Sequence, residues 1–251
     1  MLLSIFTYFL GINLVFGLSH RFDNFGDGAF PAYFDWRDYG VVSPVKDQGG
    51  CKACWAFSAV ACIESHLRIL FSNEDVLSEQ FLIDCAPDHV GCNSTSVLKA
   101  FGTIVNDLGG VLRDSDYNPY EAKEEKCSWD PLKRPIPILG YRRVQPDERL
   151  MALYVMNVGP LSAAINSASM ERYNGGIDEP TDESCSPRHT NHAVLIVGFS
   201  YYRDVGRKTF ISYWIIKNSW GKSWGDNGYY YLVRGRNACG IATDVSFPFV
   251  M

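Results

Sequence analysis

Residues 48–58 read QGGCKACWAFS, and this stretch decides the fold. Two glycines belong to a loop, and Cys54 stands where that loop turns into a run whose apolar residues recur at steps of three and four. The spacing predicts a helix from about Ala53 to Leu70. A thiol at a helix N-terminus faces unpaired N–H groups, so we expect a lowered pKa and a nucleophilic thiolate at Cys54. Alternatively, Cys54 forms a disulfide or is a buried thiol without a chemical role.

The composition is that of a globular protein of 251 residues. An apolar fraction of 47% and a charged fraction of 20% exclude bulk disorder, collagen, coiled coil and multi-span membrane proteins. A net charge of −5 disfavours nucleic acid as a partner, because phosphate binding needs a basic surface. Eight cysteines are too few for a small disulfide scaffold but more than a cytosolic domain usually carries.

The N-terminal segment has the pattern of a targeting signal. Residues 1–17 are uncharged and mostly apolar, and Val15 and Gly17 are small residues at the spacing that a signal peptidase accepts. We predict a signal peptide over 1–17, with an uncleaved anchor helix as the alternative, and a short leader over 18–30. A cleaved signal implies a secreted or lysosomal protein in an oxidising compartment, with no membrane contact after cleavage.

The rest of the chain divides by pattern into a helical part and a β part. Further helices are expected at Ser78–Asp84, with Ser78 as the N-cap, and at Ser96–Leu108, which stops at Gly109-Gly110. Short apolar runs punctuated by Gly and Asn predict strands at 161–165, 192–199, 212–217 and 229–234. We expect an α+β fold with a helical lobe over about 31–138, a β lobe over about 139–251, and a site between the lobes.

Three further residues complete a set for acyl transfer around Cys54. His192 opens an apolar strand, where a rigidly held imidazole can act as general base. Asn218 closes another strand, and its amide oxygen can accept a hydrogen bond that orients the imidazole. Gln48 precedes Cys54 by six residues and offers an oxyanion donor beside the Cys54 backbone N–H. Together these groups predict acyl-transfer chemistry.

A metal site is the alternative for part of this set. Cys185, His189 and His192 have a Cys-x3-His-x2-His spacing, but zinc needs one more ligand. We therefore expect neither a metal nor another cofactor. His66 is expected to be a surface or helix residue without a partner.

The candidate residues lie in blocks that resemble the papain-like cysteine proteases, the lysosomal cathepsins among them, from Phe30 to Met251. The matching blocks are Val45–Gly49, Cys54–Ser58, Asn191–Val194 and Lys217–Gly221, followed by Trp224-Gly225 and Asn227–Tyr229. His192 follows Cys54 by 138 residues and Asn218 follows it by 164, in the order of the family. The chain looks most like the cathepsin O subgroup at Gly91–Asn93, Leu98 and Asn191–Phe199.

The resemblance implies a fold, an activity and a role for each residue. It implies a helical left lobe, a β-barrel-like right lobe and a cysteine endopeptidase site in the cleft between them. The matching catalytic residues are Cys54, His192, Asn218 and Gln48, with Trp220 as the indole that shields the His–Asn bond. The matching lining of the pocket for the second residue upstream of the cut is Val97, Ala164, Ala193 and Asp244. The implied disulfides are Cys51–Cys92, Cys85–Cys127 and Cys185–Cys239, with Cys62 left as a buried structural thiol.

The implied partners are a protein or peptide substrate and cystatin-type inhibitors, and we expect a monomer. Members of the family usually carry an inhibitory N-terminal prodomain, and none is recognisable between Gly17 and Phe30. Asp244 at the base of the pocket would favour Arg or Lys there by a charge-assisted hydrogen bond. If Asp244 instead turns toward solvent, the pocket stays hydrophobic and takes Leu, Val or Phe.

The chain departs from the family pattern beside the expected cleft. Lys52 stands where the motif usually has glycine, and Ser94 and Thr95 stand where it has two glycines. Side chains there protrude toward the substrate, so we expect slow or narrowly selective cleavage. The alternative functions are a binding protein with an obstructed cleft and an acyl transferase whose second nucleophile is an amine. The same change creates the sequon Asn93-Ser94-Thr95, although a neighbouring disulfide cysteine favours an unmodified Asn93.

Overall fold

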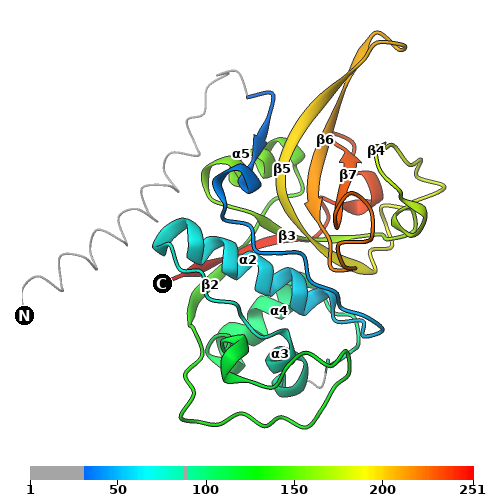
Figure 1. Ribbon diagram of the computed structural model, residues 1–251. Helices are drawn as coiled ribbons and strands as arrows, with labels where there is room; N and C mark the ends of the chain where they lie inside the picture. The colour runs from blue at the N-terminus through cyan, green and yellow to red at the C-terminus, as the bar shows by residue number, and fades with distance from the viewer. Residues whose placement is uncertain (1–30, 88–89) are drawn as a thin grey trace, which may run out of the picture. The chain divides into compact units, whose positions relative to one another are not determined.

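The long helix α2, Cys54–Phe71, lies at the centre of the computed structural model (Figure 1). The structure describes residues 31–87 and 90–251, so the predicted signal peptide and leader lie outside the described residues. Tyr33–Met251 form one compact unit, to which the following account refers. α2 is buried from Cys54 to Leu67. By length and composition α2 also passes as a membrane span, but 78% of it is buried by the rest of the chain, as in the core helix of a folded domain.

Two shorter helices contact α2. They are α3, Glu79–Cys85, and α4, Val97–Thr103, which continues as a π-helical turn over Ile104–Leu108. The predicted cap at Ser78 is present, because its side chain accepts a hydrogen bond from the backbone of Phe81. Ser96 caps α4 in the same way by accepting a hydrogen bond from the backbone of Lys99. Each cap satisfies an N–H group that has no partner inside its helix, which explains why both helices begin where the sequence predicts.

The β part is an eight-stranded sheet. Its strands are β1 Phe34–Asp35, β2 Ile138–Arg143, β3 Leu161–Ile165, β4 Ile177–Asp178, β5 His192–Asp204, β6 Thr209–Lys217, β7 Tyr229–Val233 and β8 Val245–Val250. They pair in the order β2-β8-β3-β5-β6-β7-β4, with β1 beside β5. Within the described ranges β2 and β4 do not pair, so the path is open at its ends.

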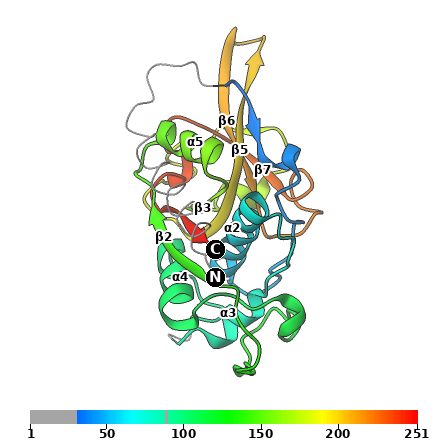
Figure 2. The same cartoon turned by 90° about the vertical axis from the view of Figure 1, so that its left-hand side faces the viewer.

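The helices α2 and α4 make contacts with the sheet. α2 contacts β3, β5 and β8, while α4 contacts β2 and β8 (Figures 1 and 2). Two elements cross the boundary expected near residue 138. β1, in the helical half of the sequence, pairs with β5, and the helix α5, Glu148–Asn157, lies in the β half and contacts β3 and β5. Gly198 allows the first crossing, because a Cβ there would lie 2.4 Å from the Phe34 carbonyl oxygen.

The outer part of β5 and β6 is a two-stranded ribbon. Among the described residues, β5 pairs with β6 alone from Tyr201 onward, and the pairing of β6 with β7 begins at Tyr213. The strands are therefore longer than the predicted 192–199 and 212–217. The prediction rested on continuous apolar runs, and only the inner part of each strand is continuously buried, whereas Tyr202 and Phe210 in the ribbon are exposed. In Figure 1 this yellow-to-orange ribbon projects beyond the other strands.

The expectation for His66 is wrong. His66 is buried in α2, its ring stacks on Phe247 with centroids 5.9 Å apart, and its Nε2 lies 3.0 Å from the Pro160 carbonyl oxygen. Burial lowers the pKa of His66 to about 4. The residue is part of the core between α2 and the sheet, and it is neutral at physiological pH.

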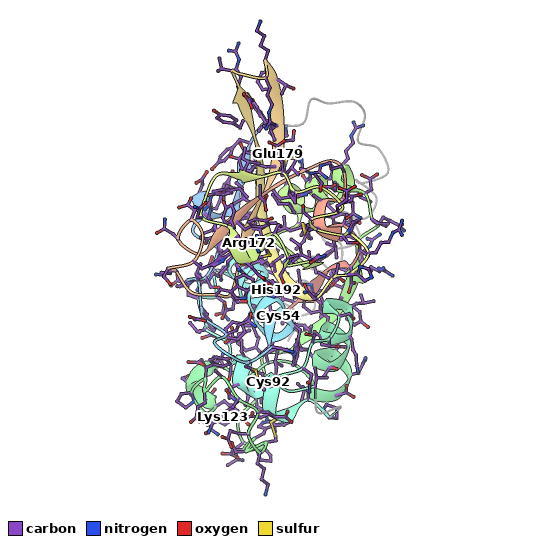
Figure 3. All side chains as sticks on the ribbon, turned by 90° about the vertical axis from the view of Figure 1, so that its right-hand side faces the viewer. Cys54, Cys92, Lys123, Arg172, Glu179 and His192 are labelled. Carbon is purple, nitrogen blue, oxygen red and sulfur yellow. A yellow bond between two sulfur atoms is a disulfide. The ribbon has the colours of Figure 1, made fainter. Side chains whose placement is uncertain are left out.

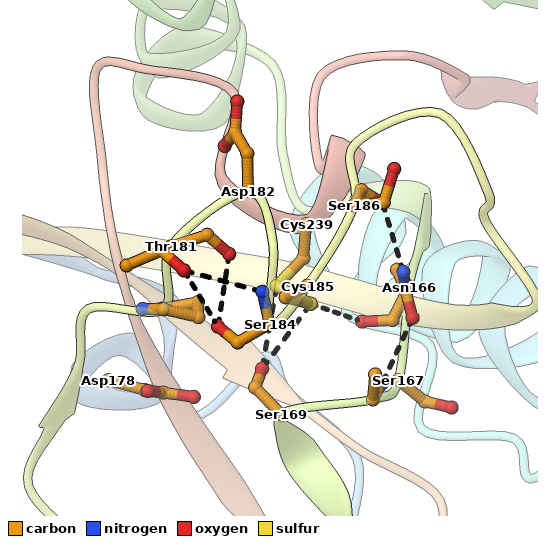
Figure 4. Close-up of a disulfide and its surroundings, with 12 residues drawn as sticks. Asn166, Ser167, Ser169, Asp178, Thr181, Asp182, Ser184, Cys185, Ser186 and Cys239 are labelled. Carbon is orange, nitrogen blue, oxygen red and sulfur yellow. Dashed lines mark hydrogen bonds between the residues drawn. A yellow bond between two sulfur atoms is a disulfide. The ribbon is translucent and has the colours of Figure 1, made fainter.

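The three implied disulfides form, namely Cys51–Cys92, Cys85–Cys127 and Cys185–Cys239, and Cys54 and Cys62 are free and buried. Figure 4 shows the third, which joins the segment before β5 to the turn at Ala238–Gly240. Asn166 supports this junction, because its backbone N–H donates to the Cys239 carbonyl at 2.8 Å and its Nδ2 donates to the Ser186 carbonyl at 2.9 Å. A disulfide cysteine cannot ligate zinc, and residues 31–87 and 90–251 contain no cluster of metal-ligating side chains.

Candidate active site

Cys54 is the first residue of α2, and its side chain packs against Val97 and Ala193. The preceding loop is held by the disulfide from Cys51 to Cys92. No side chain caps α2, so its first N–H groups stay available to a group at the helix start. The backbone amides of Ala193 and Trp55 and that of Cys54 itself hydrogen-bond to the sulfur and favour the thiolate, because they lower the pKa of Cys54.

His192 is brought to Cys54 by the sheet. It opens β5, and the next residue, Ala193, contacts the Cys54 sulfur. Figure 3 shows Cys54 and His192 beside each other. Asn218 follows the end of the neighbouring strand β6, and the His192 Nε2 lies 2.8 Å from the Asn218 Oδ1. With Nε2 bound to Asn218, the other ring nitrogen, Nδ1, is left for the thiol.

Trp220 covers the pair formed by His192 and Asn218. The rings of Trp220 and His192 lie 4.8 Å apart at a tilt of 36°. His192 is 7% exposed and Asn218 is 3% exposed, so the hydrogen bond between them is protected from water. A protected bond is electrostatically stronger than one in solvent. The indole of Trp220 therefore lies against the imidazole that Asn218 holds.

The expected lowering of the pKa of Cys54 is wrong. Burial raises it, and the amide groups at the start of α2 oppose this effect only in part. Burial also lowers the pKa of His192 to about 4, although its bond to Asn218 acts in the opposite direction. Each charge taken alone is thus disfavoured. A thiolate and an imidazolium formed together attract each other, so the proton between Cys54 and His192 belongs to one coupled equilibrium.

If this centre carries out the acyl transfer that the sequence predicts, the pH profile of kcat/KM for an uncharged substrate is expected to be bell-shaped. The Cys54–His192 pair holds a second proton only below about pH 4, because the pKa of His192 lies near that value. Activity should therefore increase as the pH is raised through about 4 and this proton leaves. It should fall again only in alkali, because the pKa of Cys54 is raised. A profile that is flat below neutrality and rises through about pH 8.5, as a free thiol ionises, would contradict the pair.

Gln48 lies next to this centre and is held on three sides. Its backbone N–H donates to the Ser219 carbonyl at 2.8 Å, and its side-chain Oε1 accepts from the Ser219 hydroxyl at 2.7 Å. Its Nε2 donates to the Cys51 carbonyl at 2.8 Å, which leaves the second hydrogen of the amide for another acceptor. Ser219 was not singled out in the sequence, although it lies in the block that follows Asn218.

The four residues expected to line the pocket come together from four segments. Ala164 on β3 is the direct partner of Ala193 on β5, and its N–H donates to the Asp244 carbonyl at 2.9 Å. Val97 touches Cys54 and Ala193 from α4. Burial raises the pKa of Asp244, whereas Arg143 and the Val97 amide lower it, so its carboxylate faces this group and has a cation nearby.

A buried charge cluster lies behind Asn218, and the sequence reasoning missed it. The cluster consists of Lys46, Glu64, Glu79 and Lys217, which line a cavity together with Ser58, Asn218 and other residues. Lys46 Nζ lies 2.7 Å from Glu79 Oε1 and 3.4 Å from Glu64 Oε1. Burial raises the pKa of Glu79 to about 7 and lowers that of Lys217 to about 8. The available signal was Glu64, an acid on the buried face of an apolar helix.

The chain is similar to cysteine proteases over most of its length. The model of a family described as papain family cysteine protease matches residues 30–249. The chain is 39% identical to cysteine proteinase 15A of Pisum sativum, a match that covers 86% of this chain and 61% of the pea protein. It is 38% identical to procathepsin L of Rattus norvegicus, with 88% and 66% covered. The chain thus spans less than two thirds of the length of these relatives.

Solved structures with the same fold include two proteases. Procathepsin L2 from the larval midgut of Tenebrio molitor superposes with a TM-score of 0.80 at 38% identity, over 89% of this chain and 70% of that one. Bromelain from Ananas comosus, solved in complex with the inhibitor E64, superposes with a TM-score of 0.76 at 35% identity, over 88% of this chain and all of that one. These matches confirm the predicted α+β papain-like fold.

Proposed function

Because the chain belongs to the papain family of cysteine proteases, we propose that it is an endopeptidase that hydrolyses peptide bonds through a thioester on Cys54. The observation that carries the proposal is the placement of the free Cys54 thiol at the start of α2, next to the buried His192–Asn218 pair. A nucleophile beside a base that is itself oriented by a third residue is the arrangement that acyl transfer requires.

In the first half of the reaction, His192 takes the proton of the Cys54 thiol and the sulfur attacks the peptide carbonyl. The carbonyl oxygen becomes an oxyanion, for which the Cys54 N–H and the Gln48 amide are the donors. The tetrahedral intermediate collapses when His192 returns the proton to the nitrogen of the leaving amine. The peptide C–N bond breaks, the amine product departs, and the acyl group stays on sulfur as a thioester.

In the second half, His192 takes a proton from water, and the resulting hydroxide attacks the thioester carbonyl. The C–S bond then breaks, the acid product leaves, and the proton on His192 returns to the Cys54 sulfur. Asn218 supports both halves, because its bond to Nε2 keeps Nδ1 directed toward the sulfur. No step needs a cofactor.

The test is hydrolysis of a quenched fluorescent peptide library by the purified chain, with mass analysis of the products. Cleavage inside the peptides with water as acceptor supports an endopeptidase. Products joined to an added amine would instead identify the acyl transferase, and failure of E64 to label Cys54 would identify a binding protein with an obstructed cleft. We also propose secretion or lysosomal delivery, which the three disulfides support. A monomeric state and inhibition by cystatin-type proteins are proposed on the family resemblance alone.

Asp244 is proposed to favour Arg or Lys at the second residue upstream of the cut. We expect Asp244→Ala to lower the ratio of kcat/KM for Arg over Leu at that position by about tenfold, the value of a weak charge-assisted hydrogen bond. Arg143 lies near the carboxylate and keeps the effect at that lower end. The exposed Asp107→Ala serves as the matched control. If Leu is preferred over Arg in the unmodified protein and Asp244→Ala leaves the ratio unchanged, the pocket is hydrophobic.

A further inference from the structure

Residues 90–97 form a short wall beside the start of α2, and we call them the rim segment. The rim segment is attached to α2 and to the loop before it at several points. The Trp55 indole donates to the Gly91 carbonyl at 3.2 Å, Cys92 is bonded to Cys51, and Val97 packs on Cys54. Figure 3 shows Cys92 and Cys54 on the same side of the molecule. The rim segment therefore keeps a fixed position next to the nucleophile.

Asn93 lies between the fastened points of the rim segment and is exposed, as is Ser94. The Asn93 backbone N–H donates to the Val90 carbonyl at 2.7 Å, so a tight turn presents this residue. In the described part of the chain, neither the Asn93 carboxamide nor the Thr95 hydroxyl has a hydrogen-bond partner. The turn thus offers both polar groups of the sequon without any contact that would have to be broken. The disulfide at the neighbouring Cys92 therefore does not prevent modification of the Asn93 side chain.

We propose that Asn93 carries an N-linked glycan that screens the approach to Cys54 against large protein partners. The modification joins the anomeric carbon of an oligosaccharide to the Asn93 Nδ2. That nitrogen loses one proton, and the lipid pyrophosphate that carried the oligosaccharide in the secretory pathway leaves. The chain holds three disulfides, which fits passage through that compartment.

The screening follows from where the sugar attaches. Asn93 is next to Cys92, whose Cα lies 4.8 Å from that of Cys51, three residues before the nucleophile. A glycan is bulky, hydrated and confined to the surface, so it occupies solvent beside the rim segment. A short peptide passes beneath it, whereas a folded protein substrate or a protein inhibitor meets it before reaching Cys54. The screening, unlike the modification, rests on the proposed endopeptidase function.

The full chain, secreted from a eukaryotic host, is compared with two variants at one position. Thr95→Ser keeps the sequon and Thr95→Ala destroys it, while both leave Asn93 in place. We expect the unmodified sequence and Thr95→Ser to be heavier than Thr95→Ala by the mass of a glycan, and to lose that mass on treatment with peptide N-glycosidase. Equal masses before and after treatment would overturn the proposal.

The screening is measured as kcat/KM for a folded protein relative to a short peptide. We expect the enzymatically deglycosylated protein to cleave the folded substrate severalfold faster than the glycosylated protein, with the peptide rate unchanged. If the mass shift is present but this ratio is the same before and after deglycosylation, the screening is wrong and the glycan stands. If neither substrate is cleaved, the endopeptidase function is overturned together with the screening, while the mass still decides the modification.

Discussion

Replacing Cys54 by alanine is expected to lower kcat/KM for peptide hydrolysis by about 10⁶-fold, the size of effect seen when a nucleophile of this kind is removed. The reason is that the substrate then has no sulfur to attack it, and His192 cannot activate water at the same place with the same geometry. The fold should survive the change, because alanine leaves the helix start intact and the side chain of Cys54 makes only weak polar contacts.

The matched control is Cys62→Ala, which removes the other free thiol. Cys62 is also buried in α2, but its sulfur lies 3.2 Å from the Pro160 carbonyl and away from His192. We expect this variant to lose some stability and to keep its activity. Mass spectrometry after E64 treatment should find one label on the unmodified protein, one on Cys62→Ala and none on Cys54→Ala. A label on Cys62, or full activity in Cys54→Ala, would remove Cys54 from the proposed reaction.

Replacing Lys46 by methionine is expected to lower the free energy of unfolding at neutral pH by about 3–5 kcal/mol, the usual cost of removing one partner from a buried ion pair. Lys46 is the cation that faces both Glu64 and Glu79, and the side chains of these acids are 0% and 4% exposed. Without Lys46 the two carboxylates lie close together in the interior. The measurement is urea denaturation of Lys46→Met beside the exposed Lys222→Met, which should change stability by less than about 0.5 kcal/mol.

The loss in Lys46→Met should shrink as the pH falls. The pKa of Glu79 in the folded chain is about 7, raised by burial from 4.5, so its contribution to stability is complete below about 4.5 and disappears as the pH rises through 7. A proton on Glu79 replaces the missing cation in acid. The double variant Lys46→Met/Glu79→Gln should therefore recover stability at neutral pH. Equal losses at pH 5 and pH 8 would show that the cluster does not act through the charge of Glu79.

The sequence predicts the elements whose signals are local. α2 and β3 lie where expected. The periodic apolar residues of α2 and the short apolar run of β3 can each be recognised from neighbouring residues alone. The helix α5 was missed among the strands even though Asp147 caps it by accepting hydrogen bonds from the backbone N–H groups of Arg149 and Leu150. A cap alone does not outweigh surrounding strand patterns when only one sequence is read.

The candidate site shows the same limit. The sequence predicted Cys54, His192 and Asn218 as candidates. Each has a side chain suited to acyl transfer, and each stands at the end of a predicted helix or strand. The raised pKa of Cys54 was not predictable, because it depends on how completely the sheet buries the start of α2. The hydrogen bond that Lys217 Nζ donates to the Ser43 hydroxyl at 2.9 Å was not predictable either, because the two residues are 174 positions apart in the chain.

The ribbon formed by the outer parts of β5 and β6 gives the protein a natural attachment point. Its tip, residues 205–208, is a turn, and Val205 is 75% exposed. An exposed turn that closes two strands tolerates inserted residues, because no buried contact depends on its length. An affinity peptide or a fluorophore placed there would leave β5 free to present His192 at its other end. Immobilisation through the tip would thus orient every molecule on a sensor surface in the same way, with the His192 end of β5 directed away from that surface.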